Sequence, residues 1–244
     1  MSIDVILTRA VDDNASLASK LDAAGLATLS LPLIEIVPEA GPHLRSIVSD
    51  LDRFEHIIFV SRNAVRHGLP LLEDFWPQWP AHLNWIAVGD ATARELARFD
   101  IDALTPAQPD SEGLLSLAAL QAIDDQRVLI VRGGDGRTLL GDELTARGAR
   151  VTYLEAYRRR AVTLELPERE LLAEGGATVV IYSEAALDSL AANLDTLGTD
   201  IEFPLVVPSA RLAAAAAAKG ADRLFQADSA YEDDVVRAVL ASRS

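Results

Sequence analysis

Short apolar runs of strand length alternate along the whole chain with longer segments in which apolar residues recur at helical spacing. The apolar runs include "DVILTRA", "HIIFVS", "RVLIVRG" and "TVVIYS". Regular alternation of strands and helices predicts an α/β fold in which a parallel sheet is flanked by helices. No apolar run approaches the roughly 18 residues of a membrane span, so we expect no membrane contact.

The alternation repeats at long range. Four segments recur in the same order at a nearly constant spacing of about 120 residues, for example "IIFVSRNAV" and "VVIYSEAAL". This repetition predicts a duplication that yields two similar α/β lobes, with a cleft between them as the ligand site. The paired positions are Arg9 with Arg132, Ser61 with Ser183, Gly89 with Ser209, and Ser111 with Ser229.

The paired positions share one chemistry, because each is a serine, glycine or arginine where a strand gives way to a helix. In open α/β sheets, ligands bind at the carboxyl ends of the strands. Serine at such a point is also an ordinary helix cap, which is the simpler interpretation of any one of them. Together the positions predict a surface of N–H and O–H donors that suits a ligand with several anionic groups.

Composition narrows the chemistry further. The net charge of −15 over 244 residues argues against nucleic acid and requires any anion site to be built locally. The chain has no cysteine, which excludes disulfides and thiolate catalysis. The opening "MSIDVILTRA" lacks the features of a secretory signal, so a cytoplasmic protein is expected. The histidines have no ligand-like spacing, and no metal site is predicted; they are His43, His56, His67 and His82.

The stretch "VRGGDGRTLL" looks like a phosphate cradle, with Gly133, Gly134 and Gly136 between Arg132 and Arg137. It lacks the third glycine of a dinucleotide fingerprint and the lysine of a phosphate-binding loop, which weakens the hypothesis of a nucleotide-dependent transferase.

Tyr157 ends the run "RVTYLEAY" and precedes three arginines. Two interpretations are open for it: a tyrosine packed at a strand end, or a hydroxyl presented between the lobes near cations.

The chain resembles the uroporphyrinogen-III synthase family nearly from end to end. The resemblance rests on "ILTRA", "LPLIEI", "IIFVSRNAV", "AVGDATARELA", "DSEGLL", "VLIVRGGDGRTLL", "RGARVTYLEAYRR" and "VVPSARLAAAAAAKGADRLFQAD". It implies two lobes joined by the strands "LPLIEIVP" and "YLEAYRRR". The first lobe would combine residues 1–35 with 161–244, and the second would span 36–160.

The resemblance also implies a cofactor-free, monomeric lyase of porphyrin and haem biosynthesis. Its substrate would be hydroxymethylbilane, a linear tetrapyrrole with acetate and propionate groups, and its products uroporphyrinogen III, with ring D inverted, and water. The anion at the loop would then be a set of carboxylates rather than a phosphate. The protein partner expected is the preceding pathway enzyme, in a transient contact.

By the same resemblance, Tyr157 matches the tyrosine proposed to help the hydroxyl leave. The positions implied to bind substrate are Arg9, Ser61, Gly89, Thr92, Ser111, Arg132, Ser183 and Ser209. The alternative of another class is a non-catalytic bilobal protein that binds or senses a small polyanion. It accounts for the duplication and the donor-rich cleft equally well, but it gives no reason for Tyr157.

Overall fold

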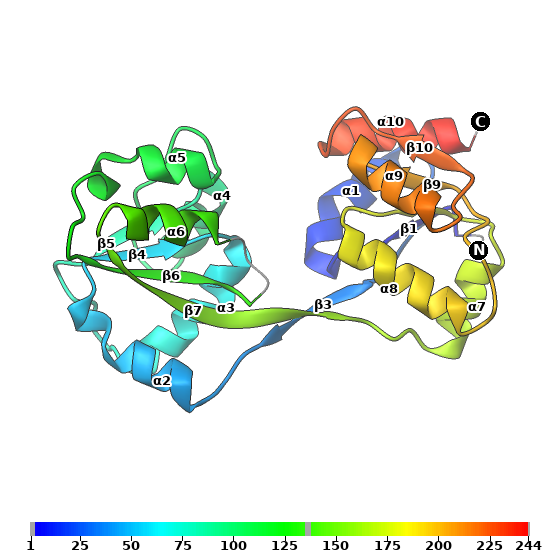
Figure 1. Cartoon of the computed structure of the whole chain (residues 1–244). Coiled ribbons are helices and arrows are strands. Elements are labelled where there is room, and N and C mark those ends of the chain that lie inside the picture. Colours follow the sequence, from blue (N-terminus) through cyan, green and yellow to red (C-terminus); the bar gives the residue numbers. More distant parts are fainter. Residues whose placement is uncertain (1–2, 135–137, 244) are drawn as a thin grey trace. The chain divides into compact units, whose positions relative to one another are not determined.

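A computed structural model describes residues 3–134 and 138–243 of the chain. The chain divides into two compact units, Met1–Glu35 with Arg160–Ser244 (unit 1) and Ile36–Arg159 (unit 2). Each unit contains a five-stranded sheet with helices on both faces (Figure 1). The predicted α/β class is confirmed, whereas the predicted cleft between the lobes stays a prediction. Within the described ranges, no helix is long and apolar enough to cross a membrane.

The sheet of unit 1 is parallel throughout, in the order β10-β9-β8-β1-β2. Its central strands are short and buried, and apart from Thr178 they consist of valine, isoleucine and leucine, as expected for a parallel sheet covered on both faces. The strands are β1 (Val5–Leu7), β2 (Thr28–Ser30), β8 (Thr178–Val180), β9 (Leu205–Val207) and β10 (Leu224–Gln226).

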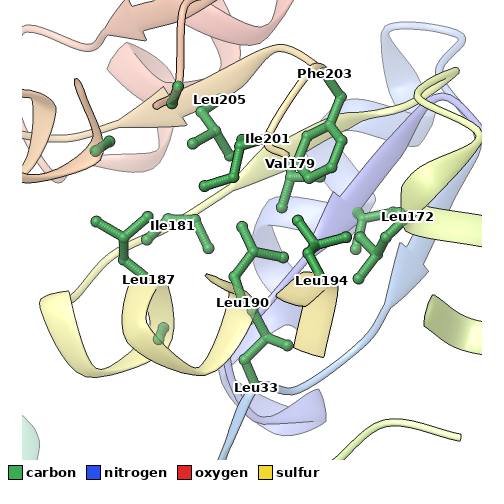
Figure 2. Close-up of a cluster of buried hydrophobic side chains, with 14 of the residues drawn as sticks. Leu33, Leu172, Val179, Ile181, Leu187, Leu190, Leu194, Ile201, Phe203 and Leu205 are labelled. Carbon is green, nitrogen blue, oxygen red and sulfur yellow. The ribbon is translucent and has the colours of Figure 1, made fainter. Parts of the chain in front are cut away.

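In the described part of unit 1, five helices cover the two faces of this sheet. Figure 2 shows leucines of one helix, among them Leu187, Leu190 and Leu194, pointing toward strand residues such as Val179 and Leu205 in one apolar cluster. One face carries α7 (Leu166–Ala173), α8 (Glu184–Asp195) and α9 (Ala210–Ala218); the other carries α1 (Val11–Ala23) and α10 (Glu232–Ser242).

The sheet of unit 2 has the order β3-β7-β6-β4-β5, and a single bridge from Ile86 to Leu104 extends it beyond β5. The four strands from β7 to β5 are parallel. The strands are β3 (Ile34–Pro38), β4 (His56–Phe59), β5 (Asn84–Ala87), β6 (Arg127–Gly133) and β7 (Arg150–Ala161).

β3 and β7 contain the two segments predicted to link the lobes. They run in opposite directions: the N–H of Glu39 bonds the carbonyl of Ala156 at 2.9 Å, and that of Val162 bonds the carbonyl of Leu33 at 3.0 Å. Ion pairs lie along the outer side of this ladder, Arg158 with Glu39 at 3.1 Å and Arg160 with Glu35 at 2.7 Å.

The helices of unit 2 also lie on both faces of its sheet (Figure 1). Gly68 lets one of them lie close against β6, because a Cβ there would come within 2.4 Å of Val131 Cγ1. One face carries α2 (Pro42–Ser49), the short η1 (Leu51–Arg53), α3 (Arg62–Glu73) and α4 (Asp90–Ala97). The other carries α5 (Ser111–Ser116), η2 (Ala118–Leu120) and α6 (Leu139–Ala146).

The two sheets share one topology, as a duplication requires. Unit 1 has the order β2-β1-β8-β9-β10, and unit 2, next to its edge strand β3, has β7-β6-β4-β5 followed by the Leu104 bridge. The strands at equal places belong to the segments paired in the sequence, for instance β1 with β6 and β4 with β8. Each unit therefore takes its first two strands from one repeat and the rest from the other, so the units are not the two halves of the chain.

Candidate functional site

The predicted site residues of unit 2 lie at one edge of its sheet. Ser61 and Gly89 follow β4 and β5, and Tyr157 is the last residue of β7 that pairs with β6. These strands are parallel, so their carboxyl ends meet at the same edge. The order β7-β6-β4 places β6 between the strand that carries Tyr157 and the strand that leads to Ser61. Two of the residues predicted separately are thereby brought into contact.

The Tyr157 hydroxyl lies 3.1 Å from Oγ of Ser61. Ser61 is the N-cap of α3, and its Oγ accepts a hydrogen bond from the N–H of Ala64 at 3.0 Å. This cap satisfies one of the free N–H groups of the first turn and fixes the serine side chain. The tyrosine hydroxyl is therefore held at the beginning of a helix by a side chain that is itself held.

A bulge in β7 turns the Tyr157 side chain toward α3. Glu155 lies opposite Arg132 and Tyr157 opposite Gly133, so Ala156 is an extra residue in the ladder. In a regular strand, Tyr153 and Tyr157 would point to the same face of the sheet. Instead, Tyr153 packs with the cluster under α6 and Tyr157 with the cluster under α3, as expected when a bulge redirects a side chain.

Gly133 gives the Tyr157 ring room to cross β6. A Cβ on Gly133 would lie 2.7 Å from Cε2 and 2.9 Å from Cζ of the tyrosine. The backbones of the two strands are joined at the same point, since the N–H of Gly134 donates to the carbonyl of Tyr157 at 3.0 Å. Gly133 thus allows the close approach of a side chain, at a place where the sequence suggested an anion cradle. Gly136 and Arg137 lie outside the described residues.

His67 is a neighbour of this pair that the sequence interpretation missed. It lies less than two turns along α3 from Ser61, and its ring centroid is 5.6 Å from that of Tyr157. Burial, and then the charge of Arg66, hold the pKa of His67 below its ordinary value, so a neutral imidazole faces the tyrosine at neutral pH. Its position on the same helix as Ser61 was the available signal.

Arg132 is buried rather than presented at the surface. Its guanidinium donates to Oε1 of Glu155 at 3.0 Å and to the carbonyl of Gly134 at 3.3 Å, and its Cζ lies 4.4 Å from the centroid of the Tyr153 ring. The positive charge of Arg132 is therefore already paired with a carboxylate of the protein, that of Glu155. That Arg132 meets a substrate carboxylate stays a prediction.

Gly89 and Thr92 line a hollow of about 290 Å³ at the same edge, where β5 leads into α4. Gly89 is required by crowding, because a Cβ would lie 2.6 Å from Cβ of Pro109 on the opposite wall. Its backbone is extended, with φ 177°, so its conformation alone does not demand glycine. Thr92 is buried in the first turn of α4. The hollow therefore opens onto the first N–H groups of a helix.

At Ser111 the interpretation as a helix cap is wrong. Asp110 is the N-cap of α5, and its carboxylate accepts from the N–H of Gly113 at 2.7 Å. Ser111 is the first residue of the helix itself. Aspartate is as good an N-cap as serine. Ser111, the position paired between the repeats, therefore lies one residue after the capping position.

In unit 1, two of the predicted residues occupy the corresponding places. Ser183 caps α8 and accepts from the N–H of Ala186 at 3.2 Å, and Ser209 caps α9 and accepts from Leu212 at 3.3 Å. They follow the adjacent strands β8 and β9, whose carboxyl ends form this edge of the sheet. Each serine oxygen only accepts in its cap, so its hydroxyl hydrogen can still be donated to a ligand.

Arg9 lies beside a tyrosine that the sequence interpretation did not single out. Its Cζ is 4.9 Å from the centroid of the Tyr182 ring, and Asp13 lies 3.9 Å away. Burial raises the pKa of Tyr182, although the charge of Arg9 opposes it. Tyr182 directly precedes Ser183 and occupies in unit 1 the place of Val60 in unit 2, so the repeat itself could have revealed it.

Asn14 holds the loop that carries Arg9 and was also missed. It is 1% exposed, and its amide donates to the carbonyls of Leu7 at 3.2 Å and Arg9 at 2.8 Å. A polar residue on the inward face of α1 was the available signal. The residue orients the site and does not itself belong to the exposed edge.

Comparison with known proteins decides the family. The sequence profile described as uroporphyrinogen-III synthase HemD matches residues 15–237. The chain belongs to the uroporphyrinogen-III synthase family. It is 33% identical over 249 residues to the uroporphyrinogen-III synthase of Salmonella typhimurium, with 97% of the chain and 100% of that protein covered. It is 31% identical over 245 residues to that of Escherichia coli K12, at the same coverage.

Solved structures of this family share the fold. A uroporphyrinogen-III synthetase from Helicobacter pylori matches with a TM-score of 0.64 at 13% identity, and covers 98% of this chain and 99% of its own. A mutant uroporphyrinogen III synthase from Thermus thermophilus matches with a TM-score of 0.60 at 17% identity, with 99% of both chains covered. Membership confirms the resemblance seen in the sequence, and the alternative of a non-catalytic binding protein is not favoured.

Proposed function

We propose that this protein converts hydroxymethylbilane into uroporphyrinogen III and water, with the last ring inverted. Family membership supports the reaction. The observation that carries the assignment of the site is the contact between the hydroxyls of Tyr157 and Ser61, 3.1 Å apart at the carboxyl edge of unit 2. It supplies one positioned proton donor, which is the main demand this reaction makes on a side chain.

The chemistry starts with departure of the terminal hydroxyl of the bilane. The carbon–oxygen bond breaks, water leaves once the oxygen has gained a proton, and an electron-poor azafulvene remains. The far pyrrole attacks through its substituted carbon to give a spiro intermediate, which fragments and recloses with that ring inverted. The pyrrole proton lost at the end balances the one that left with water. No electrons are gained or lost, so no redox partner is needed.

Tyr157 serves the first step by donating a hydrogen bond to the departing oxygen. The arrangement with Ser61 suits this role. The Ser61 oxygen already accepts from the N–H of Ala64, and its own hydrogen can point at the tyrosine oxygen. The phenolic hydrogen is then not used in this contact and is available to the departing oxygen of the substrate. The neutral His67 ring packs beside the phenol without bringing a positive charge to it.

The remaining demand is to hold a flexible polyanion so that its two ends meet. Helix beginnings provide N–H groups for carboxylates without the entropy cost of long side chains. Charge-assisted bonds contribute about 1.5–3 kcal/mol each, so a few of them suffice to coil the substrate. The residues proposed to take part are Arg9, Ser61, Gly89, Thr92, Ser111, Arg132, Ser183 and Ser209.

The test is the isomer made from freshly prepared hydroxymethylbilane. After oxidation, the porphyrins are separated, and the inverted isomer is expected to predominate with the protein and the uninverted isomer without it. The same assay with heat-denatured protein controls for spontaneous closure. A product containing only the uninverted isomer would refute the proposal and favour a protein that merely binds polyanions. A cytoplasmic location, a monomeric state and contact with the preceding enzyme stay predictions.

A further inference from the structure

The sheet register places Arg9 and Tyr182 side by side at the carboxyl edge of unit 1. β1 and β8 are adjacent parallel strands in which Leu7 lies opposite Val180, and Arg9 and Tyr182 each come two positions later. The hydroxyl of Thr8 donates to the carbonyl of Val180 at 2.6 Å and joins the ends of the two strands. The Cζ atom of Arg9 is thereby held 4.9 Å from the centroid of the Tyr182 ring.

Arg9 is fixed at both ends. The buried amide of Asn14 donates to the carbonyl of Arg9 at 2.8 Å, and the ring of Tyr182 faces the guanidinium. A guanidinium that stacks on an aromatic ring uses its flat face, so N–H groups in its plane remain available to a planar carboxylate. Burial raises the pKa of Tyr182, although Arg9 opposes it, so the phenol stays neutral and does not cancel the charge of Arg9.

The duplicated arginine of unit 2, Arg132, is placed differently. Val60 stands where unit 1 has Tyr182, and the ring beneath Arg132 belongs instead to Tyr153 of the strand on its other side. Glu155 pairs with the Arg132 guanidinium at 3.0 Å, and 9% of the arginine side chain is exposed. The tyrosine at the end of β8 is therefore a feature of unit 1 that the duplication did not require.

The guanidinium of Arg9 is accessible. Its side chain is 37% exposed, about four times as much as that of Arg132. Among the residues that the structure describes, the carboxylate within ion-pair distance of it is Asp13, which at 3.9 Å is beyond hydrogen-bond distance. The nearby Glu232 is held by the hydroxyl of Ser16 at 2.7 Å and by Lys20 at 3.1 Å. A carboxylate from outside can therefore bind Arg9 without displacing a hydrogen-bonded one.

We propose that Tyr182 is a positioning residue, which holds the guanidinium of Arg9 in the orientation that binds a carboxylate group of the tetrapyrrole. Tyr182 acts through Arg9, and the pair contributes to substrate binding and not to the bond-making steps. Ser183 directly follows Tyr182 and begins α8, so this subsite belongs to the carboxyl edge of unit 1. The inference rests on the proposed function, which supplies the ligand.

The first experiment measures KM and kcat for hydroxymethylbilane in Tyr182→Val, Tyr182→Phe and Arg9→Gln. Tyr182→Val removes the ring and gives unit 1 the residue found in unit 2, so KM should rise about threefold to tenfold with kcat within about twofold of wild type. Tyr182→Phe keeps the ring, and its KM should stay within about twofold of wild type. Arg9→Gln should raise KM at least as much as Tyr182→Val. Arg223→Gln is its control, because Arg223 is exposed and precedes β10, at the opposite edge of the same sheet.

The double variant Arg9→Gln/Tyr182→Val separates positioning from packing. If Tyr182 acts through Arg9, adding Tyr182→Val to Arg9→Gln should change KM by less than about twofold. A further rise as large as in the wild-type background would overturn the inference, and so would an unchanged KM in folded Tyr182→Val. Tyr182 packs against the apolar cluster under α1 and α10. Tyr182→Leu, which keeps more of the side-chain volume, therefore replaces Tyr182→Val if that variant does not fold.

The second experiment distinguishes this inference from the proposed function. Binding of uroporphyrin III, the stable oxidised form of the product, is followed by porphyrin fluorescence in wild type, Tyr182→Phe and Tyr182→Val. A Kd that rises about threefold to tenfold in Tyr182→Val alone supports the subsite, even if the wild type formed only the uninverted isomer, a result that would remove only the proposed function. Wild type that forms the inverted isomer, with equal KM and equal porphyrin binding in all three proteins, would refute the inference and leave the proposed function intact.

Discussion

Tyr157 and Ser61 lie 96 residues apart in the chain, yet their hydroxyl oxygens are separated by 3.1 Å. The contact spans a whole strand, because β6 lies between β7 and β4 in the sheet. It depends on three local features: the cap of α3, the bulge in β7, and the missing side chain at Gly133. Each feature can be altered by a single substitution.

Tyr157→Phe should lower kcat for uroporphyrinogen III formation by more than tenfold. The variant loses the hydroxyl but keeps the ring that fills the cluster under α3, so the thermal unfolding midpoint should change little. Tyr231→Phe is the control, because it removes the same hydroxyl group from a tyrosine that is 81% exposed. Wild-type turnover in Tyr157→Phe would exclude the tyrosine from the chemical step.

Ser61→Ala should affect both stability and rate. Loss of the cap of α3 is expected to lower the free energy of unfolding by about 1 kcal/mol. Loss of the contact with Tyr157 should also lower kcat, but less than Tyr157→Phe does. In the double variant the two effects on kcat should not add, since one interaction is shared. Fully additive effects on ln kcat would mean that the hydroxyl contact is unimportant for the reaction.

Gly133→Ala should reduce activity far more than Gly134→Ala. At Gly133 a new methyl group would come within 2.7 Å of the Tyr157 ring and displace it, whereas at Gly134 the nearest atom, Oε2 of Glu155, is 3.8 Å away. The described backbone has no positive φ at either glycine, so the pair differs mainly in this clash. Steady-state kinetics on both variants test it, and equal losses would show that the close approach is irrelevant.

His67 should make the protein less stable as the pH falls through about 6.5. Its pKa is lowered in the folded state, so the unfolded chain binds more protons between that lowered value and the ordinary 6.5. Stability is therefore retained above the ordinary value and lost below it. Urea unfolding at pH 7.5 and 5.5 should show a larger drop for wild type than for His67→Gln. Equal drops in the two proteins would assign the pH dependence to other groups.

Local signals in the sequence predicted much of the fold correctly. The alternation of apolar runs and helical segments predicted the α/β class, because burial on both faces of a parallel sheet leaves a plain pattern. The serines at three paired positions are helix caps, at Ser61, Ser183 and Ser209. A helix cap depends on residues within four positions of each other, so it can be predicted from the local sequence. At Ser111 the same argument failed, since the neighbouring Asp110 competes for the same N–H groups.

The candidate site was only partly predictable. Tyr157 was picked for its position before three arginines, but nothing in the sequence indicated that it reaches Ser61 or that His67 faces it. Gly133 was interpreted as part of an anion site, and nothing in the sequence indicated that it also clears a path for an aromatic ring. Arg132 is buried against Glu155 and Tyr153, a placement that the sequence did not indicate, and its contact with a substrate carboxylate stays a prediction. These contacts depend on partners that are distant in the chain.

The sequence by itself determined the elements, the repeat and the family, because these follow from periodicity, from capping and from motifs that persist in order along the chain. Only the tertiary structure decided which residues meet. Strand order places β6 between Tyr157 and Ser61, the bulge after Glu155 selects the face on which the tyrosine lies, and helix packing brings Arg66 and Arg98 to one carboxylate. Such pairings depend on the packing of whole elements, and no local pattern of residues encodes them.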